Sequence, residues 1–189
     1  MPREQMHIGN AAGFSVDRMD VGGPVADSLI ASGKPAALFY ETLAERTLAI
    51  AQRERRANPE KGYTPDLAGF VGPVLKRCVE NGVPIIGNFG AANPMGAAKR
   101  LHALAKTQGI SGLRVAVVDG DDLRENIRGL QTQQWGEEKP LDLANTEILA
   151  ANVYMGSQPI ADALDQDPHV VVTGRVTDSA LTLGPLMQH

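Results

Sequence analysis

Several features that would narrow the function of a protein are missing from this sequence of 189 residues. Its single cysteine, Cys78, excludes an internal disulfide framework and favours a reducing compartment. No apolar stretch reaches the roughly eighteen residues that a membrane-spanning helix requires. Residues 1–5 contain no apolar region of the kind found in signal peptides. These absences predict a cytoplasmic protein that has no membrane partner.

An excess of positive charge is missing as well. Lysine and arginine number 18 against 22 acidic residues, which gives a net charge of -4, and the pI is about 5.5. The most basic stretch, residues 53–56, is interpreted as the solvated end of a helix. Because no basic stripe is present, nucleic acid is not an expected partner.

Common cofactor and metal motifs are also absent. Residues 87–90 lack the G-x-G-x-x-G spacing of dinucleotide-binding folds, and no Gly-Lys-Ser/Thr of a P-loop occurs. The four histidines are not spaced as zinc ligands, and residue order alone indicates no Ser-His-Asp triad. The sequence therefore disfavours a nicotinamide dehydrogenase and a P-loop kinase, predicts no metal site, and does not identify a cofactor.

What the chain does contain is four short apolar runs that stop abruptly in small and polar residues. They cover residues 6–8, 83–86, 115–118 and 170–172. Continuous runs of this kind are typical of strands that are buried on both faces of a parallel sheet. The loops that follow such strands meet along one edge of the sheet, where open α/β folds bind their ligands.

Helical periodicity, proline near helix starts and glycine after helix ends predict helices between these runs. The expected helices are 24–30, 42–56, 65–80, 94–108, 121–130, 159–164 and from 179 onward, with further strands at 36–40 and 148–154 and an exposed excursion at 132–140. Alternating strands and helices predict a Rossmann-like layered α/β fold. We expect one domain over residues 1–189, with a mostly parallel sheet of about five strands flanked by helices and right-handed crossovers.

The loops after the first and third of these strands are candidates for substrate binding through Asn10, Gly13, Asn88, Gly90 and Asn93. Small residues let backbone N–H groups approach a ligand, and asparagine amides fix its polar atoms. The alternative is that the glycines supply unusual backbone angles and the asparagines hydrogen-bond the turns.

The loop that begins with Gly174 and Arg175 has the layout of an anion site, since it follows a strand and precedes a helix. An arginine at such a position needs an anionic partner, which is either a ligand or an internal carboxylate such as Glu41 or Asp119. Asp178 is a general base in one interpretation and the cap of the final helix in the other.

Three carboxylates are candidates for acid–base catalysis: Glu41, Asp119 and Asp178. A divalent metal held by Asp119, Asp121 and Asp122 is the less favoured alternative. Only one or two of these three side chains can point to a common centre, and helix capping accounts for one of them.

Taken in order along the chain, these segments resemble the acyclic terpene utilisation AtuA family. The resemblance rests on IGNAAGFS at 8–15 with DR at 17–18, ETLAERT at 41–47, NFGAANP at 88–94, VDGDD at 118–122, ANVYMG at 151–156, TGRVTDSAL at 173–181 and LGPL at 183–186. Members of the family are longer, so the chain is expected to correspond to their N-terminal part.

The resemblance implies a cytoplasmic catabolic role in the breakdown of branched terpenoid or related acids as coenzyme A thioesters, often beside acyl-CoA carboxylase and hydratase enzymes. The family has no assigned catalytic residues, so none is transferred. The first hypothesis is an enzyme acting on an anionic small molecule, an acyl-CoA or a carboxylic acid. The second is a non-catalytic binding or assembly subunit of an acyl-CoA carboxylase system, and a homo-oligomer is a further expectation.

Two observations would separate these hypotheses. A carboxylate whose pKa is raised in a pocket beside Arg175 would favour the enzyme. An apolar patch around Leu181, Leu183 and Leu186 would favour the binding or assembly subunit, or a missing C-terminal half.

Overall fold

The computed structural model describes residues 5–14 and 16–189, so residues 1–4 and Ser15 of the first motif lie outside the described part. It contains a five-stranded sheet, in the order β1-β2-β3-β5-β4, in which every neighbouring pair is parallel. The strands are β1 (His7–Asn10), β2 (Ala36–Tyr40), β3 (Ile85–Gly87), β4 (Val115–Val118) and β5 (Val170–Thr173). The predicted class of fold and the parallel sheet are confirmed.

The strands are apolar without alternation because both faces of the sheet are covered. Ile85 and Val170 face one apolar cluster, while Ile86 and Val171 face the other. This follows from the alternation of side chains along a strand, which sends successive residues to opposite faces.

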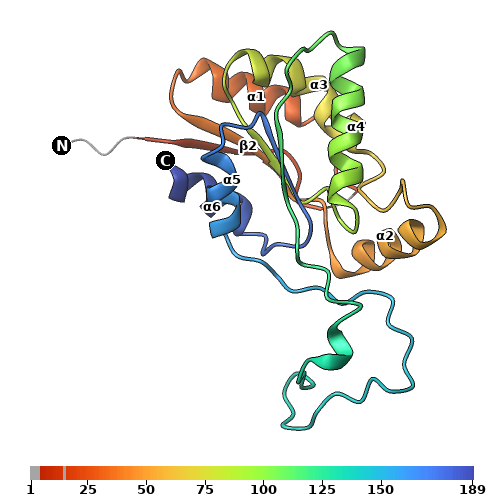
Figure 1. Cartoon of the computed structure of the whole chain (residues 1–189). Coiled ribbons are helices and arrows are strands. Elements are labelled where there is room, and N and C mark those ends of the chain that lie inside the picture. The colour runs from red at the N-terminus through yellow and green to blue at the C-terminus, as the bar shows by residue number, and fades with distance from the viewer. Residues whose placement is uncertain (1–4, 15) are drawn as a thin grey trace.

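Helices cover the two faces unequally (Figure 1). On one face lie α1 (Gly22–Ala31), α3 (Leu67–Glu80) and α4 (Pro94–Thr107), and on the other lie α5 (Gln158–Leu164) and α6 (Ala180–Gln188). The chain proceeds along the sheet from β1 to β4 on the first face, then turns back to β5 through α5 on the second face. A reversal of direction combined with a change of face gives every crossover the same hand, and right-handed crossovers stay a prediction.

The predicted helix at 42–56 begins later, as α2 (Glu45–Ala57). Residues 41–44 instead form a loop at the carboxyl end of β2, and α2 lies beyond this end of the sheet. Its buried side, Leu48 and Ala51, packs on Leu43, Ala91 and Ala92. The helix therefore closes over the edge where the strand-end loops meet.

Two predicted elements are wrong, and both lie between β4 and α5. The helix expected at 121–130 is only a 3₁₀ turn (Ile127–Gly129), and the segment expected as a strand at 148–154 forms one isolated bridge, Asn152 to Asp122. Asp121 does not cap a helix because its carboxylate turns inward to accept hydrogen bonds. Residues 119–157, which we call the excursion, leave the body of the molecule and return to it (Figure 1).

No helix in the described part of the chain is long and apolar enough to cross a membrane.

The start of α1 offers a test of the packing. A methyl group added at Gly22 would lie 2.2 Å from the Tyr40 hydroxyl, which is buried and donates a hydrogen bond of 3.0 Å to the carbonyl of Phe70, whereas one added at Gly23 would meet no atom within 4 Å. We expect Gly22→Ala to lower the free energy of unfolding by about 1–3 kcal/mol through overpacking. The matched Gly23→Ala should be neutral or stabilising by up to about 1 kcal/mol. Urea unfolding of both variants checks this, and equal effects would contradict it.

Candidate functional site

The buried polar side chains in the described part of the chain all belong to the carboxyl edge of the sheet or to elements that pack against it. They are Thr42, Gln52, Thr64, Asn88, Asn93, Asp121, Thr173 and Arg175. Burial of a polar group is unfavourable unless it is hydrogen-bonded. Their concentration at one edge marks the candidate site.

The edge contains a topological switch point. After β3 the chain enters α4 on one face of the sheet, and after the neighbouring β5 it enters α6 on the other face. The two loops touch, because the Gly90 N–H donates to the carbonyl of Thr173 at 3.1 Å. A side chain at Gly90 would place its Cβ 2.5 Å from that oxygen, so the approach requires glycine. Ligands of open α/β folds bind at such a crevice.

Asn88 connects the loops after β2 and β3. Its amide nitrogen donates to Glu41 Oε1 at 2.8 Å, and its oxygen accepts from the Thr42 N–H at 2.7 Å. The Thr42 and Thr64 hydroxyls lie 3.2 Å apart and are hydrogen-bonded. Glu41 Oε1 also accepts from the Leu43 N–H at 3.0 Å. A continuous chain of hydrogen bonds therefore runs from Thr64 to the Glu41 carboxylate.

Arg175 occupies the centre of the site, and its side chain is only 4% exposed. One guanidinium nitrogen, Nη1, donates to the carbonyl of Leu43 and lies 4.0 Å from Glu41 Oε1. The other, Nη2, donates to Asp178 Oδ1 at 2.7 Å. The guanidinium carbon lies 4.1 Å from the centre of the Tyr154 ring, a cation–π contact. The internal carboxylates near Arg175 are thus Asp178 and Glu41 rather than Asp119.

Asp121 holds the backbone of the same loop. Its Oδ2 accepts from the Arg175 N–H and from the amide of Asn152, each at 2.7 Å. A side chain at Gly174 would place its Cβ 2.1 Å from Asp121 Oδ1, which explains the glycine. The amide oxygen of Asn152 is buried and has no hydrogen-bond partner among the described residues.

The electrostatics of two carboxyl groups in the site, the partly buried Glu41 and the buried Asp121, are similar. Burial raises the pKa of Glu41, and the hydrogen bonds from Asn88 and Leu43 oppose this increase only in part. Burial likewise raises the pKa of Asp121 against the hydrogen bonds from Arg175 and Asn152. A carboxyl group with a raised pKa exchanges protons closer to neutral pH, as acid–base catalysis requires.

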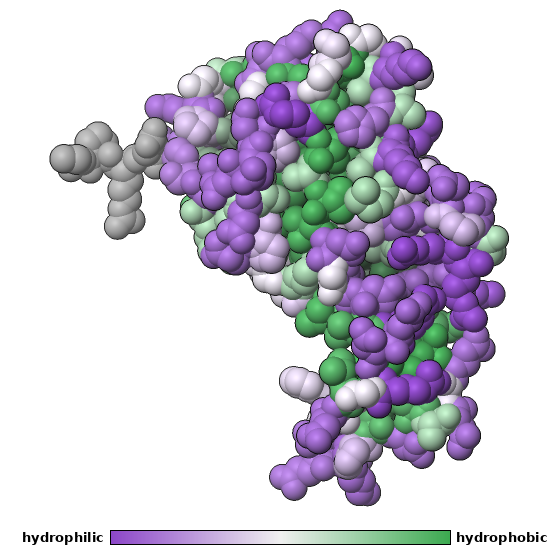
Figure 2. All heavy atoms as spheres, in the orientation of Figure 1, coloured by the Kyte–Doolittle hydropathy of each residue, from purple (hydrophilic) through white to green (hydrophobic). Residues whose placement is uncertain are grey.

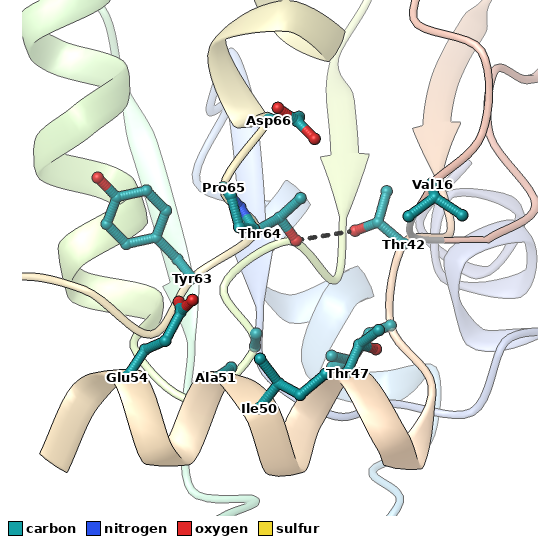
Figure 3. A pocket seen from close by; sticks show the side chains of 12 residues that line it. Val16, Thr42, Thr47, Ile50, Ala51, Glu54, Tyr63, Thr64, Pro65 and Asp66 are labelled. Carbon is teal, nitrogen blue, oxygen red and sulfur yellow. Dashed lines mark hydrogen bonds between the residues drawn. The ribbon is translucent and has the colours of Figure 1, made fainter. Parts of the chain in front are cut away.

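A cavity of about 200 Å³ adjoins the hydrogen-bonded threonines. Figure 3 shows Thr42 and Thr64 joined in its wall, with Ile50 and Ala51 of α2 opposite them. Most of the side chains that line the cavity are apolar or present methyl groups. The cavity is thus a largely apolar space that is connected to Glu41 through hydroxyl and amide groups.

The predicted binding residues after β1 lie outside this cluster. Asn10 is exposed, and its side-chain oxygen accepts from the Ala12 N–H at 3.1 Å. The Gly13 N–H donates to Asp17 at 2.9 Å. Both residues stabilise the turn that follows an edge strand, and their role in binding stays a prediction.

Two other candidates serve local structure. Asn93 caps α4 by accepting from the Gly96 N–H at 3.0 Å, and its amide donates to the carbonyls of Pro59 and Lys61. Asp119 is exposed and accepts from the Gly120 N–H at 2.8 Å.

The Asp178 carboxylate accepts a hydrogen bond from Arg175, and the capping position of α6 falls on Ser179.

The site also contains Asp121, which the sequence suggested only as a metal ligand or helix cap. Its other unpredicted components are Thr42, Thr64, Asn152 and Tyr154. A signal was present for most of them, because Thr42 lies in the ETLAERT segment, Asp121 in VDGDD, and Asn152 and Tyr154 in ANVYMG. No group of three or more histidine, cysteine, aspartate or glutamate residues within 5–14 and 16–189 is arranged to hold a metal ion.

The fold and site define a layered α/β protein with a polar cluster at the switch point of a parallel sheet. A family model described as acyclic terpene utilisation family protein AtuA matches residues 6–189, and the chain belongs to this family. Membership suggests a role in acyclic terpene utilisation. Comparisons with curated proteins and with solved structures gave no match.

The raised pKa of Glu41 predicts how stability depends on pH. The folded protein holds this proton to a higher pH than the unfolded chain, so the contribution to stability is present at low pH and lost as pH rises above about 4.5. Glu41→Gln should remove this contribution, and its stability should fall less than that of the native protein between about pH 4.5 and pH 7.

Urea unfolding across this pH range measures the effect. Glu137→Gln, on the exposed excursion, is the matched control and should follow the native profile. Parallel profiles for Glu41→Gln and the native protein would show that the pKa of Glu41 is not raised by folding.

Proposed function

We propose that the protein is an enzyme of acyclic terpene breakdown that acts on a branched carboxylic acid or its coenzyme A thioester. The observation that carries this proposal is a carboxyl group of raised pKa, Glu41, 4.0 Å from the buried cation of Arg175. The pair lies at the switch point of the sheet, where this class of fold binds ligands. This combination favours the enzyme over the binding or assembly subunit.

Arg175 would hold the anionic or carbonyl end of the substrate. Its Nη2 is bonded to Asp178, whose side chain is 67% exposed and therefore free to rotate into solvent. A ligand carboxylate or thioester oxygen would take the place of the Asp178 oxygen on the guanidinium. The Leu43 carbonyl and the Tyr154 ring would keep the guanidinium in position during this exchange.

Glu41 would supply the acid–base chemistry. Its side chain is 13% exposed, so it is shielded from water but reachable from the site. The amide of Asn88 and the N–H of Leu43 fix the position of Oε1. Asp178 is the second candidate for proton transfer because it shares the same arginine, while Asp119 faces solvent. The cavity beside Thr42 and Thr64 would hold the aliphatic part of the substrate.

One observation supports the binding or assembly subunit as the second candidate. Helix α6 exposes Leu183, Leu186 and Met187 by 47%, 45% and 54%, whereas Leu181 is buried. The expected patch is therefore present without Leu181. An interface there would serve a homo-oligomer or a carboxylase-associated complex, in the cytoplasm as the composition predicts, and is compatible with catalysis at the other site.

Ligand binding tests the anion site. Branched acyl-CoA esters and the matching free acids should raise the melting temperature by several degrees, since a ligand at a hundredfold excess over its Kd stabilises by about 2.7 kcal/mol. Asp178→Asn removes the carboxylate that competes for Arg175, so it should bind these anions more tightly. Arg175→Gln should abolish the shift, and Arg100→Gln, on the exposed side of α4, should leave it unchanged.

Circular dichroism establishes that each variant is folded before the comparison is made. If no acid or acyl-CoA stabilises the native protein, or if Asp178→Asn weakens binding, the proposed anion site is wrong. The Asp178 variant keeps the test decisive should Arg175→Gln fail to fold, because Asp178 is largely exposed.

A further inference from the structure

A second set of cavities lies between α2 and the excursion, outside the site described above. One is an apolar groove of about 470 Å³, with Leu48 and Ala49 of α2 on one wall and Leu143 and Leu149 of the excursion on the other. Figure 2 shows apolar side chains at the surface of the excursion, bordered by hydrophilic residues. The groove brings together two segments that are nearly a hundred residues apart in the sequence.

The groove continues into a cleft of about 470 Å³ that contains three arginines, Arg56, Arg124 and Arg128. The two cavities are contiguous because Glu147 and Ile148 line both of them. An apolar channel that ends in clustered guanidinium groups is complementary to a ligand with an aliphatic arm and a phosphate end.

The cleft also contains two carboxylates, Glu125 and Glu147, and both are largely exposed. Arg124 pairs with Glu125 at 3.6 Å. The Arg128 guanidinium donates to the carbonyls of Leu143 and Thr146, so it is positioned without a carboxylate. Arg56 pairs with Glu147 at 3.1 Å, and that carboxylate is 72% exposed. Exposed ion pairs contribute little, so a phosphate can displace Glu147 at small cost.

The groove also borders the candidate functional site. Tyr154 and Asn152 line the groove. The Tyr154 ring also packs on the Arg175 guanidinium, and the Asn152 amide donates to Asp121. A ligand lying in the groove would therefore contact both the arginine cleft and Tyr154, the side chain that packs on the Arg175 guanidinium.

We propose that Arg56, Arg124 and Arg128 bind the phosphate groups of a ligand whose aliphatic arm lies in the groove and leads to Arg175. This inference rests on the proposed function and adds a second anchoring point to its substrate. Two ligands share the required chemistry: a coenzyme A thioester, whose pantetheine arm would fill the groove, and an isoprenoid diphosphate, whose hydrocarbon chain would fill it.

Calorimetric titration of the full chain tests the phosphate cleft with four probes. These are a branched acyl-CoA, the matching acyl-pantetheine, the free acid, and geranyl diphosphate. Arg124→Gln and Arg128→Gln should each weaken binding of the phosphorylated ligand by about tenfold, the loss of one charge-assisted hydrogen bond. They should leave binding of the free acid and of acyl-pantetheine unchanged. Added NaCl should weaken only the phosphorylated ligand strongly.

Two further variants separate phosphate binding from a structural role. Arg53→Gln, exposed on α2 outside the cleft, should bind as the native protein does. Glu147→Gln should bind the phosphorylated ligand more tightly, because Arg56 loses its competing carboxylate. Equal losses in Glu147→Gln and the arginine variants would mean that the excursion has merely come away from α2, and would overturn the proposal.

The outcomes also distinguish this proposal from the proposed function. Preference for acyl-CoA over acyl-pantetheine identifies the thioester as the ligand, and preference for geranyl diphosphate identifies the isoprenoid. If the free acid binds but phosphate groups add no affinity, the cleft proposal fails while the anion site at Arg175 stands. If none of the four probes binds, both proposals fail.

Discussion

The burial of Arg175 is the constraint on which the arrangement of the site depends. A guanidinium cannot lose its hydration without replacement hydrogen bonds, and removing one partner of a buried charge typically costs about 3–5 kcal/mol. Arg175 obtains these contacts from three separate segments: the carbonyl of Leu43 after β2, Asp178 after β5, and the ring of Tyr154 in the excursion. Arg175 is therefore one of the side chains that couple the excursion to the sheet, beside Asp121, which accepts from the Arg175 N–H.

The same desolvation that requires partners for Arg175 also gives Glu41 its chemical character. Its pKa is raised because water is excluded, and the amide of Asn88 holds its oxygen without supplying a charge. The 4.0 Å separation leaves Arg175 an incomplete counterion for Glu41. The site therefore combines a fixed cation with a nearby carboxyl group that is not hydrogen-bonded to it. This arrangement is suited to an anionic substrate.

Local sequence signals predicted an element correctly where residues within that element stabilise it. The strand at 36–40 and the start of α4 at Pro94 were predicted at their observed positions. The signals failed at 121–130 and 148–154, because Asp121 and Asn152 hydrogen-bond each other and the loop of Arg175 instead of capping a helix or joining a ladder. Residue type also could not separate Asn88, which holds Glu41, from Asn93, which caps a helix, since both follow the same strand.

Residue patterns were enough to predict a parallel α/β sheet, polar loops along its carboxyl edge, and an anionic partner for Arg175. The sequence motifs also indicated the family that the family model confirms. Tertiary structure alone decided which polar residues meet. Strand order places β5 beside β3, so Arg175 reaches the loop that contains Glu41. The excursion returns to the site and places the Tyr154 ring against the Arg175 guanidinium. Such contacts depend on strand order and on long-range hydrogen bonds, neither of which leaves a periodic signal in the chain.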